Sequence, residues 1–516
     1  MIKKTNKFVS NGRLHDAATP DWRDEFIDAG LTFADVLLRP QFSELETRAE
    51  KEGGPKTEIQ LTPKIKLTIP IISANMDTVT ESAMAVAMAR YGGLGIIHRN
   101  CSVEKQVEEI KKVKQAEEGF IKNPYTLNPA SYVNRARQMM AEHQIDSILI
   151  VESFRKELVG LITKYEIANI SGSELVQDYM KPRKDLIVIE AKEYLTAGNA
   201  IKLAEQVFKN QPLLGKLPFI DKSGKLLGLI TKKDLFRSAE YPSATKDEHG
   251  CLRVGAAIGI DDDVYKPMGR AEQLLGAGAD ILVLDVAHAH AEKPIEVAKI
   301  IKKHYPHCEL IAGNVSTLEA VRDYARIGVD AIKVGIGPGA TCSTRIISGA
   351  GVPQVSAILE CARESEKYGI PIIADGGIRY PRDVSIAIAC GASAVMVGTL
   401  FAGTDESPGD ILDDNGRTVK VVRGMSSLGV NVGIKGDGFI KAGLKDMIQP
   451  EGIIGQVPYR GPLIRVLGAL IAGLRSGMTY AGAATIKELQ MPFSRKFTRV
   501  SRAAWEESKP HDIEII

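Results

Sequence analysis

The sequence predicts an α/β protein: a (β/α)8 TIM barrel with a smaller tandem unit inserted into it. Three observations carry this prediction. Short apolar, β-branched runs alternate with helical segments along most of the chain. The alternation stops at about residue 123 and resumes after about residue 248. The chain has 516 residues, enough for two or three domains. Repeated parallel βα units indicate a barrel, with a doubly wound open sheet as the alternative.

The elements follow one another in a regular order. Residues 1–30 are polar and irregular, which predicts an extended arm. Early strands are expected at 65–73 and 95–98, with helices at 81–91 and 103–118. The two early strands bring the expected count to eight. Further strands are expected at 253–259, 281–284, 310–312, 331–334, 372–374 and 394–397, and further helices at 294–304, 317–327, 354–368 and 382–389.

The inserted segment, residues 123–248, contains an internal repeat. Val159–Ile167 recurs as Leu227–Leu235, and a helical segment and a short β run precede each copy. Self-similarity of this kind predicts two copies of one supersecondary unit. The barrel would then consist of residues 31–122 and 249–516.

The composition indicates neither a nucleic-acid nor a membrane partner. The formal net charge is +2, and 44% of residues are hydrophobic. No apolar run approaches the roughly 20 residues of a membrane span, and the basic N-terminus lacks the apolar core of a secretory signal. The six cysteines are scattered without a CxxC pair, which predicts a reducing compartment without disulfides or zinc. We therefore expect a cytoplasmic protein.

The strongest chemical signal is the stretch Lys333–Arg345. An apolar run leads into a glycine-rich loop, and Cys342 follows with hydroxyls at Ser343 and Thr344. A thiol on such a loop, at the carboxyl end of a strand, lies where an α/β barrel keeps its chemistry. Its thiolate can attack an electrophilic carbon. A small buried cysteine in a turn is the structural alternative.

This stretch resembles the catalytic loop of the IMP dehydrogenase / GMP reductase family, in which a cysteine bonds covalently to C2 of a purine nucleotide. Other segments are similar to family segments and occur in family order. They are Ser73–Glu81, Gly92–His98, Ala312–Val315, Ala374–Ile378 and Gly403–Gly409. The resemblance spans most of the chain and favours the barrel over the open sheet.

The resemblance implies roles for individual residues. Cys342 would be the nucleophile, with Thr344 and Glu451 moving a proton. The purine nucleotide would contact Ser73, Met76, Asn314, Ser343, Asp375, Gly376, Gly377, Gly398, Thr399, Met425 and Ser426. The nicotinamide cofactor would lie near Asp285, Ala287, Gly335 and Gly337, and the carbonyls of Gly337, Gly339 and Cys342 would bind K⁺ with Glu506, Glu507 and Ser508 of a neighbouring chain.

The two repeats look like a pair of CBS modules, which commonly bind adenine or guanine nucleotides. The resemblance implies that Thr163 with Glu166, and Thr231 with Asp234, lie near the ribose of a regulatory nucleotide. A pair that only mediates subunit contacts is the alternative. Relatives assemble as tetramers that pair into octamers, so we expect a homotetramer and possible octamers here.

Two departures from the family bear on the reaction. Its dehydrogenases carry an Arg-Tyr pair on a flap that hydrolyses the covalent intermediate, and residues 428–449, within the expected flap at about 428–460, contain neither residue. Met425 with Ser426 and Ser427 is similar to the reductase form. The prediction is therefore a GMP reductase that converts GMP and NADPH to IMP and ammonia.

The alternative is an IMP dehydrogenase, which converts IMP, NAD and water to XMP and NADH. Thr78–Glu81 and Pro458–Pro462 look dehydrogenase-like and support it. A non-catalytic CBS nucleotide sensor is the remote alternative.

Overall fold

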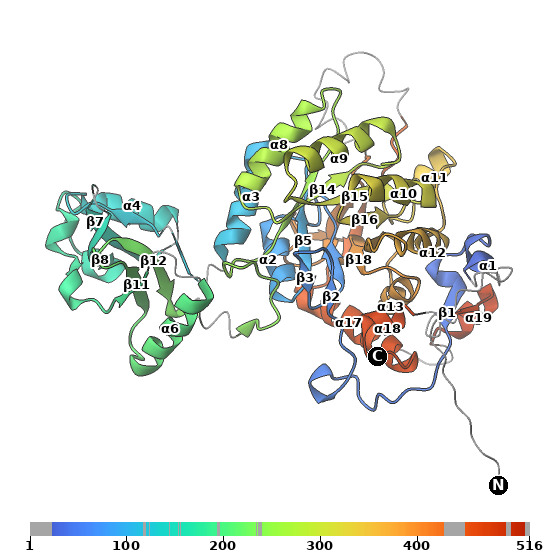
Figure 1. Ribbon diagram of the computed structural model, residues 1–516, viewed down its shortest axis with the longest axis horizontal. Helices are drawn as coiled ribbons and strands as arrows, with labels where there is room; N and C mark the ends of the chain where they lie inside the picture. Colours follow the sequence, from blue (N-terminus) through green and yellow to red (C-terminus); the bar gives the residue numbers. More distant parts are fainter. Residues whose placement is uncertain are drawn as a thin grey trace, which may run out of the picture.

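Eight parallel strands close into a barrel at the centre of the protein (Figure 1). The computed structural model describes residues 23–510 except 117–119, 123, 144, 153, 155, 193–196, 234, 236–239, 428–448 and 492–496. The strand order around the barrel is β13-β14-β15-β16-β17-β18-β4-β5. Their bounds are β4 Ile71–Ser73, β5 Leu94–Ile97, β13 Gly255–Ile258, β14 Ile281–Asp285, β15 Glu309–Val315, β16 Ala331–Val334, β17 Ile372–Asp375 and β18 Ala394–Val397. The predicted barrel is confirmed.

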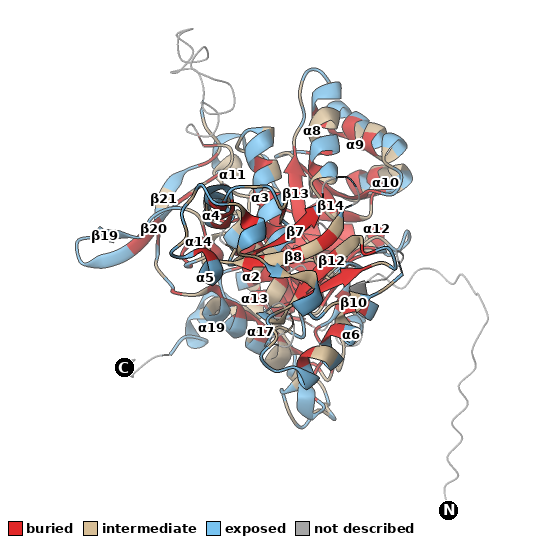
Figure 2. Ribbon diagram, turned by 90° about the vertical axis from the view of Figure 1, so that its left-hand side faces the viewer, coloured by how far each residue is buried: buried red, intermediate tan, exposed pale blue. Residues whose placement is uncertain are grey.

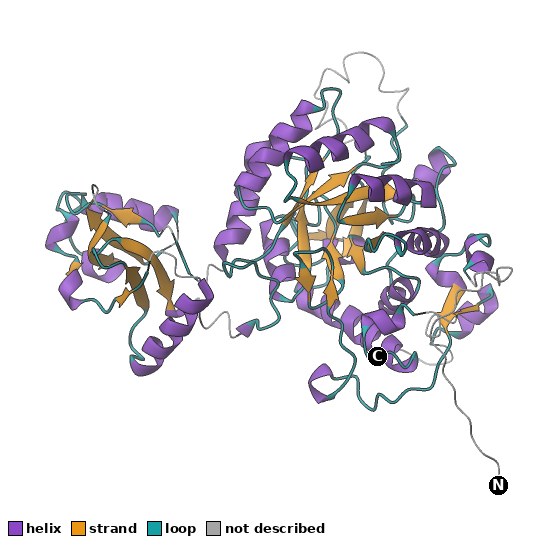
Figure 3. Ribbon diagram, in the orientation of Figure 1, coloured by secondary structure: helices purple, strands orange, loops and turns teal. Residues whose placement is uncertain are grey.

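Two strand pairings complete the barrel. One joins the strands on either side of the insertion, and the other joins the first barrel strand in the sequence to the last. Ile97 of β5 pairs with Ala256 of β13, and Ser73 of β4 pairs with Val397 of β18. Helices surround the strands on the outside (Figure 3), so nearly every strand residue is buried. These helices are α2 Ser82–Arg90, α3 Val103–Ala116, α8 Tyr265–Gly276, α9 Glu292–His304, α10 Leu318–Ile327, α12 Gln354–Ser365, α13 Pro381–Ala389 and α17 Leu463–Tyr480.

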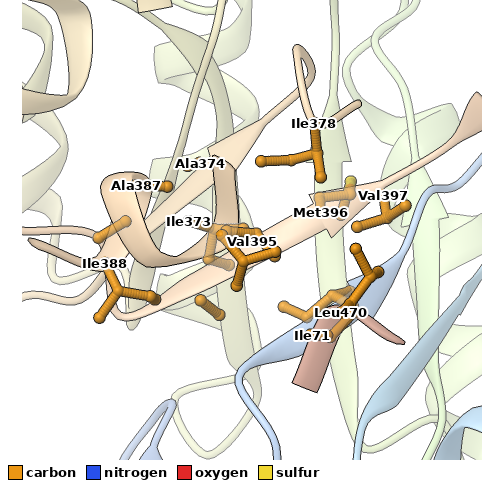
Figure 4. Packing of buried hydrophobic residues seen from close by; sticks show 14 of the residues in the cluster. Ile71, Ile373, Ala374, Ile378, Ala387, Ile388, Val395, Met396, Val397 and Leu470 are labelled. Atoms are coloured by element: carbon orange, nitrogen blue, oxygen red, sulfur yellow. The ribbon is translucent and has the colours of Figure 1, made fainter. Parts of the chain in front are cut away.

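Branched apolar side chains of neighbouring strands fill the core. Ile71, Ile373 and Val395 come from three successive strands and pack together with Leu470 of α17 (Figure 4). The first three are fully buried and Leu470 is nearly so. Removing one such side chain from water stabilises the fold by about 1.5–3 kcal/mol. The buried residues concentrate in the strands of the barrel (Figure 2).

The first predicted strand, 65–73, is in fact two separate strands. Lys66–Leu67 forms β3, which pairs antiparallel with β2 Ile59–Gln60, whereas the barrel strand β4 begins at Ile71. Pro70 lies between them. Proline has no N–H to donate to a strand ladder, so the chain leaves one sheet before it enters the barrel.

The last part of the predicted extended arm is folded. Helix α1 spans Asp24–Ile27 and contacts α12, and Phe26 is buried against the ring of Phe497 at 6.0 Å. One apolar ring in a polar stretch is a weak signal that the sequence prediction did not use. Residues 1–22 of the arm lie outside the described part of the chain.

The segment between α3 and β13 forms two small sheets beside the barrel (Figure 1). One contains β6 Thr126–Leu127, β7 Ser147–Glu152, β8 Glu157–Thr163 and β9 Lys181–Pro182; the other contains β10 Ile189–Glu190, β11 Lys216–Ile220 and β12 Leu226–Thr231. Helices α4 Val133–Glu142, α5 Lys164–Ile167 and α6 Ala197–Asn210 accompany them. Leu149, Leu158, Ile220 and Leu229 form one apolar cluster, so the two repeats pack on each other.

The remaining strands and short helices lie outside the closed barrel. An antiparallel sheet contains β19 Leu412–Asp414, β20 Arg417–Arg423 and β21 Ile454–Pro458. An early and a late segment of the chain pair antiparallel as β1 Val36–Leu38 and β22 Phe497–Arg499. Short helices are α11 Thr344–Ile347, α14 Thr399–Ala402, α18 Ile486–Leu489 and α19 Arg502–Glu507. The β20–β21 hairpin matters most, because it brings two distant segments to the carboxyl ends of the barrel strands.

Candidate active site

A cavity of about 210 Å³ opens at the carboxyl ends of the barrel strands. Asn75 follows β4, Asp285 and Asp375 end β14 and β17, and Cys342 lies on the loop after β16. Met425 reaches the same cavity from the end of β20. Parallel strands present all their carboxyl ends on one side, so residues far apart in the sequence converge there.

A continuous chain of hydrogen bonds leads from the thiol to a carboxylate. Cys342 Sγ donates to Thr344 Oγ1 at 3.2 Å, and Thr344 Oγ1 donates to Glu451 Oε2 at 2.7 Å. All three residues line the cavity. These hydrogen bonds connect the thiol side of the cavity to Glu451 through the threonine hydroxyl; proton movement by Thr344 and Glu451 stays a prediction.

Backbone pairing holds Glu451 in this position. Ser343 N donates to Glu451 O at 2.8 Å, and Ile453 N donates to Thr341 O at 2.9 Å. Gly452 fits between the strands of this small ladder, because a Cβ there would lie 2.7 Å from Ser427 N. Segments 341–343, 424–427 and 451–453 therefore form one unit around the thiol.

A buried lysine organises the polar floor of the cavity. The Lys333 side chain is 2% exposed, and its Nζ donates to Asp375 Oδ2 at 2.7 Å and to Asp285 Oδ1 at 3.3 Å. It also donates to Asn314 Oδ1, whose amide nitrogen donates to Asp375 Oδ2 at 2.9 Å. Burial opposes the charge of Lys333, but Asp375 and Asp285 outweigh it and raise its pKa. The floor is thus a charged, internally paired network.

The same network controls the ionisation of Asp285. Burial of its carboxyl opposes ionisation, but Lys333 and Arg99 outweigh burial, so the pKa of Asp285 lies below its usual range. Arg99 Nε lies 3.9 Å from Asp285 Oδ2. Asp285 is therefore an anion that can accept hydrogen bonds from amide or hydroxyl groups of a ligand.

Most of the predicted site residues line the cavity. Besides the relay, by which we mean Cys342, Thr344 and Glu451, these residues are Met76, Asp285, Ala287, Asn314, Gly335, Gly337, Gly339, Asp375, Gly376, Met425 and Ser426. Five predicted contacts do not line it: Ser73, Ser343, Gly377, Gly398 and Thr399. Ser73 is buried beneath the cavity, where its Oγ accepts from Thr80 at 2.8 Å. A ligand reaching the last two would extend past the cavity toward the start of α14.

Lys333 and Arg99 were not predicted as site residues, although both line the cavity. Lys333 lay inside a strand that the pattern marked as apolar and buried. A lone lysine in such a strand was the available signal, because a buried ammonium group requires anionic partners. Arg99 follows β5 and offered no comparable signal. Thr341, Met396 and Gly424 were also missed.

The fold and this site define a class: a TIM barrel with a cysteine thiol in the cavity at the carboxyl ends of its strands and an inserted tandem unit. The chain belongs to the IMP dehydrogenase / GMP reductase family, since the model of the IMP dehydrogenase / GMP reductase domain matches residues 30–511. Its substrates are accordingly purine nucleotides, and its second substrate is a nicotinamide cofactor. The predicted family membership is confirmed.

Relatives with both names are similar over nearly their whole lengths. Inosine-5'-monophosphate dehydrogenase from Aquifex aeolicus is 46% identical over 95% of this chain and 96% of its own. The enzyme of that name from Nitrosopumilus maritimus is 42% identical over 94% and 98%. A crystal structure of a GMP reductase variant from Trypanosoma brucei with guanosine 5'-monophosphate has a TM-score of 0.84 and 37% identity, covering 94% of this chain and 98% of that one.

The described residues contain neither a membrane-spanning helix nor a cluster of metal-binding side chains. No helix among them is long and apolar enough to cross a membrane. Within the same residues, no group of three or more His, Cys, Asp or Glu side chains could hold a metal ion.

Proposed function

We propose that this protein is an IMP dehydrogenase, the alternative to the GMP reductase that the sequence predicted. The relay of Cys342, Thr344 and Glu451 carries the proposal, because it provides both a nucleophile and a path for a proton. Relatives named inosine-5'-monophosphate dehydrogenase, at 42–46% identity over nearly the full chain, support oxidation of IMP over reduction of GMP.

The proposed reaction has two stages at the same carbon. The Cys342 thiolate adds to C2 of IMP, and the C2 hydrogen then leaves as a hydride, which forms a thioimidate on the enzyme. Bound NAD supplies the hydride acceptor. Water then adds to C2, the thiolate of Cys342 departs, and XMP is released. Thr344 and Glu451 accept the proton that the attacking water loses.

The residues beside the thiol fit a nicotinamide cofactor. Asp285 is an anionic acceptor at the cavity wall, where the carboxamide nitrogen or a ribose hydroxyl can donate to it. Ala287, Gly335 and Gly337 also line the cavity and carry no side chain larger than a methyl group. The preference for NAD over NADPH follows from the choice of reaction.

A K⁺ site on the catalytic loop is part of the proposal. The carbonyls of Gly337, Gly339 and Cys342 on this loop would supply part of the K⁺ shell, and Gly339 O also accepts from Cys342 N at 3.0 Å. Oxygens of Glu506, Glu507 and Ser508 from a second copy would complete it in the proposed homotetramer. Activity that rises with K⁺ and not with Na⁺ supports this site, and equal activity in both salts contradicts it.

GMP reduction is the second candidate, and the sequence around Met425 favours it. Ser426 and Ser427 are similar to the reductase form, and residues 428–449 contain neither Arg nor Tyr. Residues 428–448, most of the predicted flap, lie outside the described part of the chain. In this reaction the 2-amino group would leave as ammonia, and no water would need a base.

The near-ultraviolet absorbance of reduced nicotinamide separates the two reactions. Purified protein is incubated with IMP, NAD and K⁺ in one cuvette and with GMP and NADPH in another. Rising absorbance with XMP formation in the first supports the dehydrogenase; falling absorbance in the second supports the reductase. C342A is the matched control and should be silent in both. Silence of the native protein in both cuvettes, with tight ATP or GTP binding, would favour the nucleotide sensor.

We further propose that the inserted unit is a CBS pair that binds a regulatory adenine or guanine nucleotide. Thr163 ends β8 and Thr231 ends β12, at corresponding positions of the two repeats. Asp234 lies outside the described residues. Glu166 Oε2 accepts from Thr163 N at 2.6 Å, so this carboxylate supports the start of α5 and is a weaker ribose acceptor. Calorimetric titration of ATP and GTP into T163A and T231A would test which repeat binds.

A further inference from the structure

An ion pair connects two walls of the cavity. Arg423 ends β20, and Asp77 lies in the loop after β4. Arg423 donates from Nε to Asp77 Oδ2 at 2.8 Å and from a terminal nitrogen to the same oxygen. The side-chain amide of Asn100 donates to that oxygen as well, so three N–H groups from two residues, Arg423 and Asn100, converge on one atom.

The burial of this pair makes it costly to break. The Asp77 side chain is 4% exposed and that of Arg423 is 37% exposed. The second carboxylate oxygen of Asp77 is buried and has no hydrogen-bond partner among the described residues. A carboxylate withdrawn from water in this way depends on its cation, and removing the cation leaves an uncompensated buried charge.

The residues next to the pair form the cavity walls. Asn75 and Met76 directly precede Asp77, while Gly424 and Met425 directly follow Arg423, and all four line the cavity. The backbone N–H of Arg423 lies 3.4 Å from Thr78 Oγ1, a further weak contact across the same gap. The pair therefore couples the position of one wall to the position of the other.

One of these walls rests directly on the loop of the nucleophile. Gly424 N donates to Ile453 O at 2.9 Å, and Ile453 N in turn donates to Thr341 O. A Cβ on Gly424 would lie 2.7 Å from Thr341 O, so the segment could not approach so closely with a larger residue. Segment 424–427 is thus held at two places: it packs against the Cys342 loop, and the neighbouring Arg423 is paired with Asp77.

We propose that Asp77 and Arg423 are positioning residues that hold segment 424–427 against the Cys342 loop and so set the affinity of the cavity for a purine nucleotide. The inference rests on the proposed function, because it takes this cavity to be the nucleotide site. Without the ion pair the wall has to be ordered when the nucleotide binds, and this ordering weakens binding. The thiol itself touches neither residue, so its intrinsic reactivity stays unchanged.

Alkylation of Cys342 by iodoacetamide tests this inference without requiring turnover. The full-length protein is alkylated at increasing IMP concentrations, and mass spectrometry follows the peptide that contains Cys342. The rate without nucleotide reports the thiol and its surroundings; the IMP concentration that halves the rate reports nucleotide affinity. The variants are D77N and R423K, with E50Q as the matched control. Glu50 pairs with Arg475 in an ion pair that does not line the cavity.

The expected result is a selective loss of affinity. In D77N the half-protecting IMP concentration rises about tenfold, while the rate without nucleotide stays within about twofold of the native rate. R423K shows a smaller rise, because lysine keeps the charge without the fork of donors. E50Q matches the native protein. A D77N/R423Q double variant loses no more affinity than D77N, since the two residues share one interaction.

The outcomes separate this inference from the proposed function. If IMP halves the alkylation rate of D77N and R423K at the same concentration as in the native protein, the positioning role is overturned. Native protein that neither IMP nor GMP protects would instead overturn the proposed function. If D77N fails to fold, its buried cysteines are alkylated too, and R423K, whose side chain is partly exposed, then decides the question.

Discussion

Two threonine–glutamate pairs in this protein perform different tasks. In the barrel, Glu451 accepts a hydrogen bond from the side chain of Thr344, 107 residues away. In the inserted unit, Glu166 accepts from the backbone N–H of Thr163, three residues away. The first pair continues to a cysteine thiol in a cavity, and the second begins a short exposed helix. The same residue types thus extend a hydrogen-bond chain from a thiol, proposed to transfer a proton, in one place and cap a helix in the other.

The difference follows from the origin of the carboxylate. A glutamate three residues after an N-cap position reaches back to that backbone through local geometry alone, in any fold. Glu451 reaches Thr344 because a backbone ladder joins two loops of the barrel. The distant contact requires the folded barrel, and it places the carboxylate at an enclosed site where proton transfer is useful.

Removing the relay gives the largest expected effect. E451Q and T344V should each lower kcat by about 10²–10³-fold, because each breaks the path of the proton. If the reaction is IMP oxidation, a burst of NADH in the first turnover should persist, since water attack comes after hydride transfer. Stopped-flow and steady-state absorbance measure the two stages. A native kcat in both variants would show that the pair is only structural.

The lysine beneath the relay tests how far the site depends on buried charge. K333M leaves Asp375 and Asp285 without their cation and should destabilise folding by about 3–5 kcal/mol. Urea denaturation followed by circular dichroism measures the change. K302M removes a more exposed lysine from its pair with Asp330 and should cost clearly less. Equal losses in both variants would contradict a special role for the buried network.

A third glutamate, Glu81, should give an effect on stability that is smaller than that of Lys333 and larger than that of Glu166. Hydrogen bonding from His98 and then Lys105 outweighs burial and lowers the pKa of Glu81 from 4.5 to about 2. The folded state therefore binds fewer protons than the unfolded state between these values. Ionised Glu81 stabilises the fold above pH 4.5, and this contribution is lost as the pH falls toward 2.

The side chain of Glu81 is 26% exposed, and solvent screening leaves about 1–2 kcal/mol of this stabilisation. E81Q should accordingly be less stable than the native protein at neutral pH, and the gap should narrow as the pH falls below 4.5. Denaturant titrations at several pH values measure the gap. A gap independent of pH would show that charge plays no part.

Removing the local pair gives the smallest expected effect. E166Q should lower stability by about 0.5–1 kcal/mol, because it weakens one hydrogen bond at the start of α5. The kcat of the barrel should stay native, in contrast to E451Q. Thermal unfolding and steady-state rates provide the two measurements. A loss of kcat in E166Q would mean that the inserted unit acts on the active site, which would break the comparison.

Local features of the chain were enough to predict the barrel and the repeat, and to place a cysteine after the end of a strand. Strand runs, helical periodicity and glycine-rich turns are local features, so the alternation of elements and the position of Cys342 could be read directly. The family resemblance added Thr344 and Glu451. The predicted element boundaries were wrong at two places. Pro70 divides the apolar run that was predicted as one strand, and Phe26 is buried within a segment that was predicted as an extended arm.

Which distant residues contact one another became clear only from the folded chain. The Lys333 network, the contact of Arg423 with Asp77 and the ladder around Gly452 each join segments that come together through barrel closure or the β20–β21 hairpin. Such contacts depend on through-space distance and on the desolvation of buried charge, and no local pattern records either quantity. For this reason the sequence predicted Lys333 only as a residue of an apolar strand. Its burial beside two carboxylates, which the fold brings together, makes it the centre of the cavity floor.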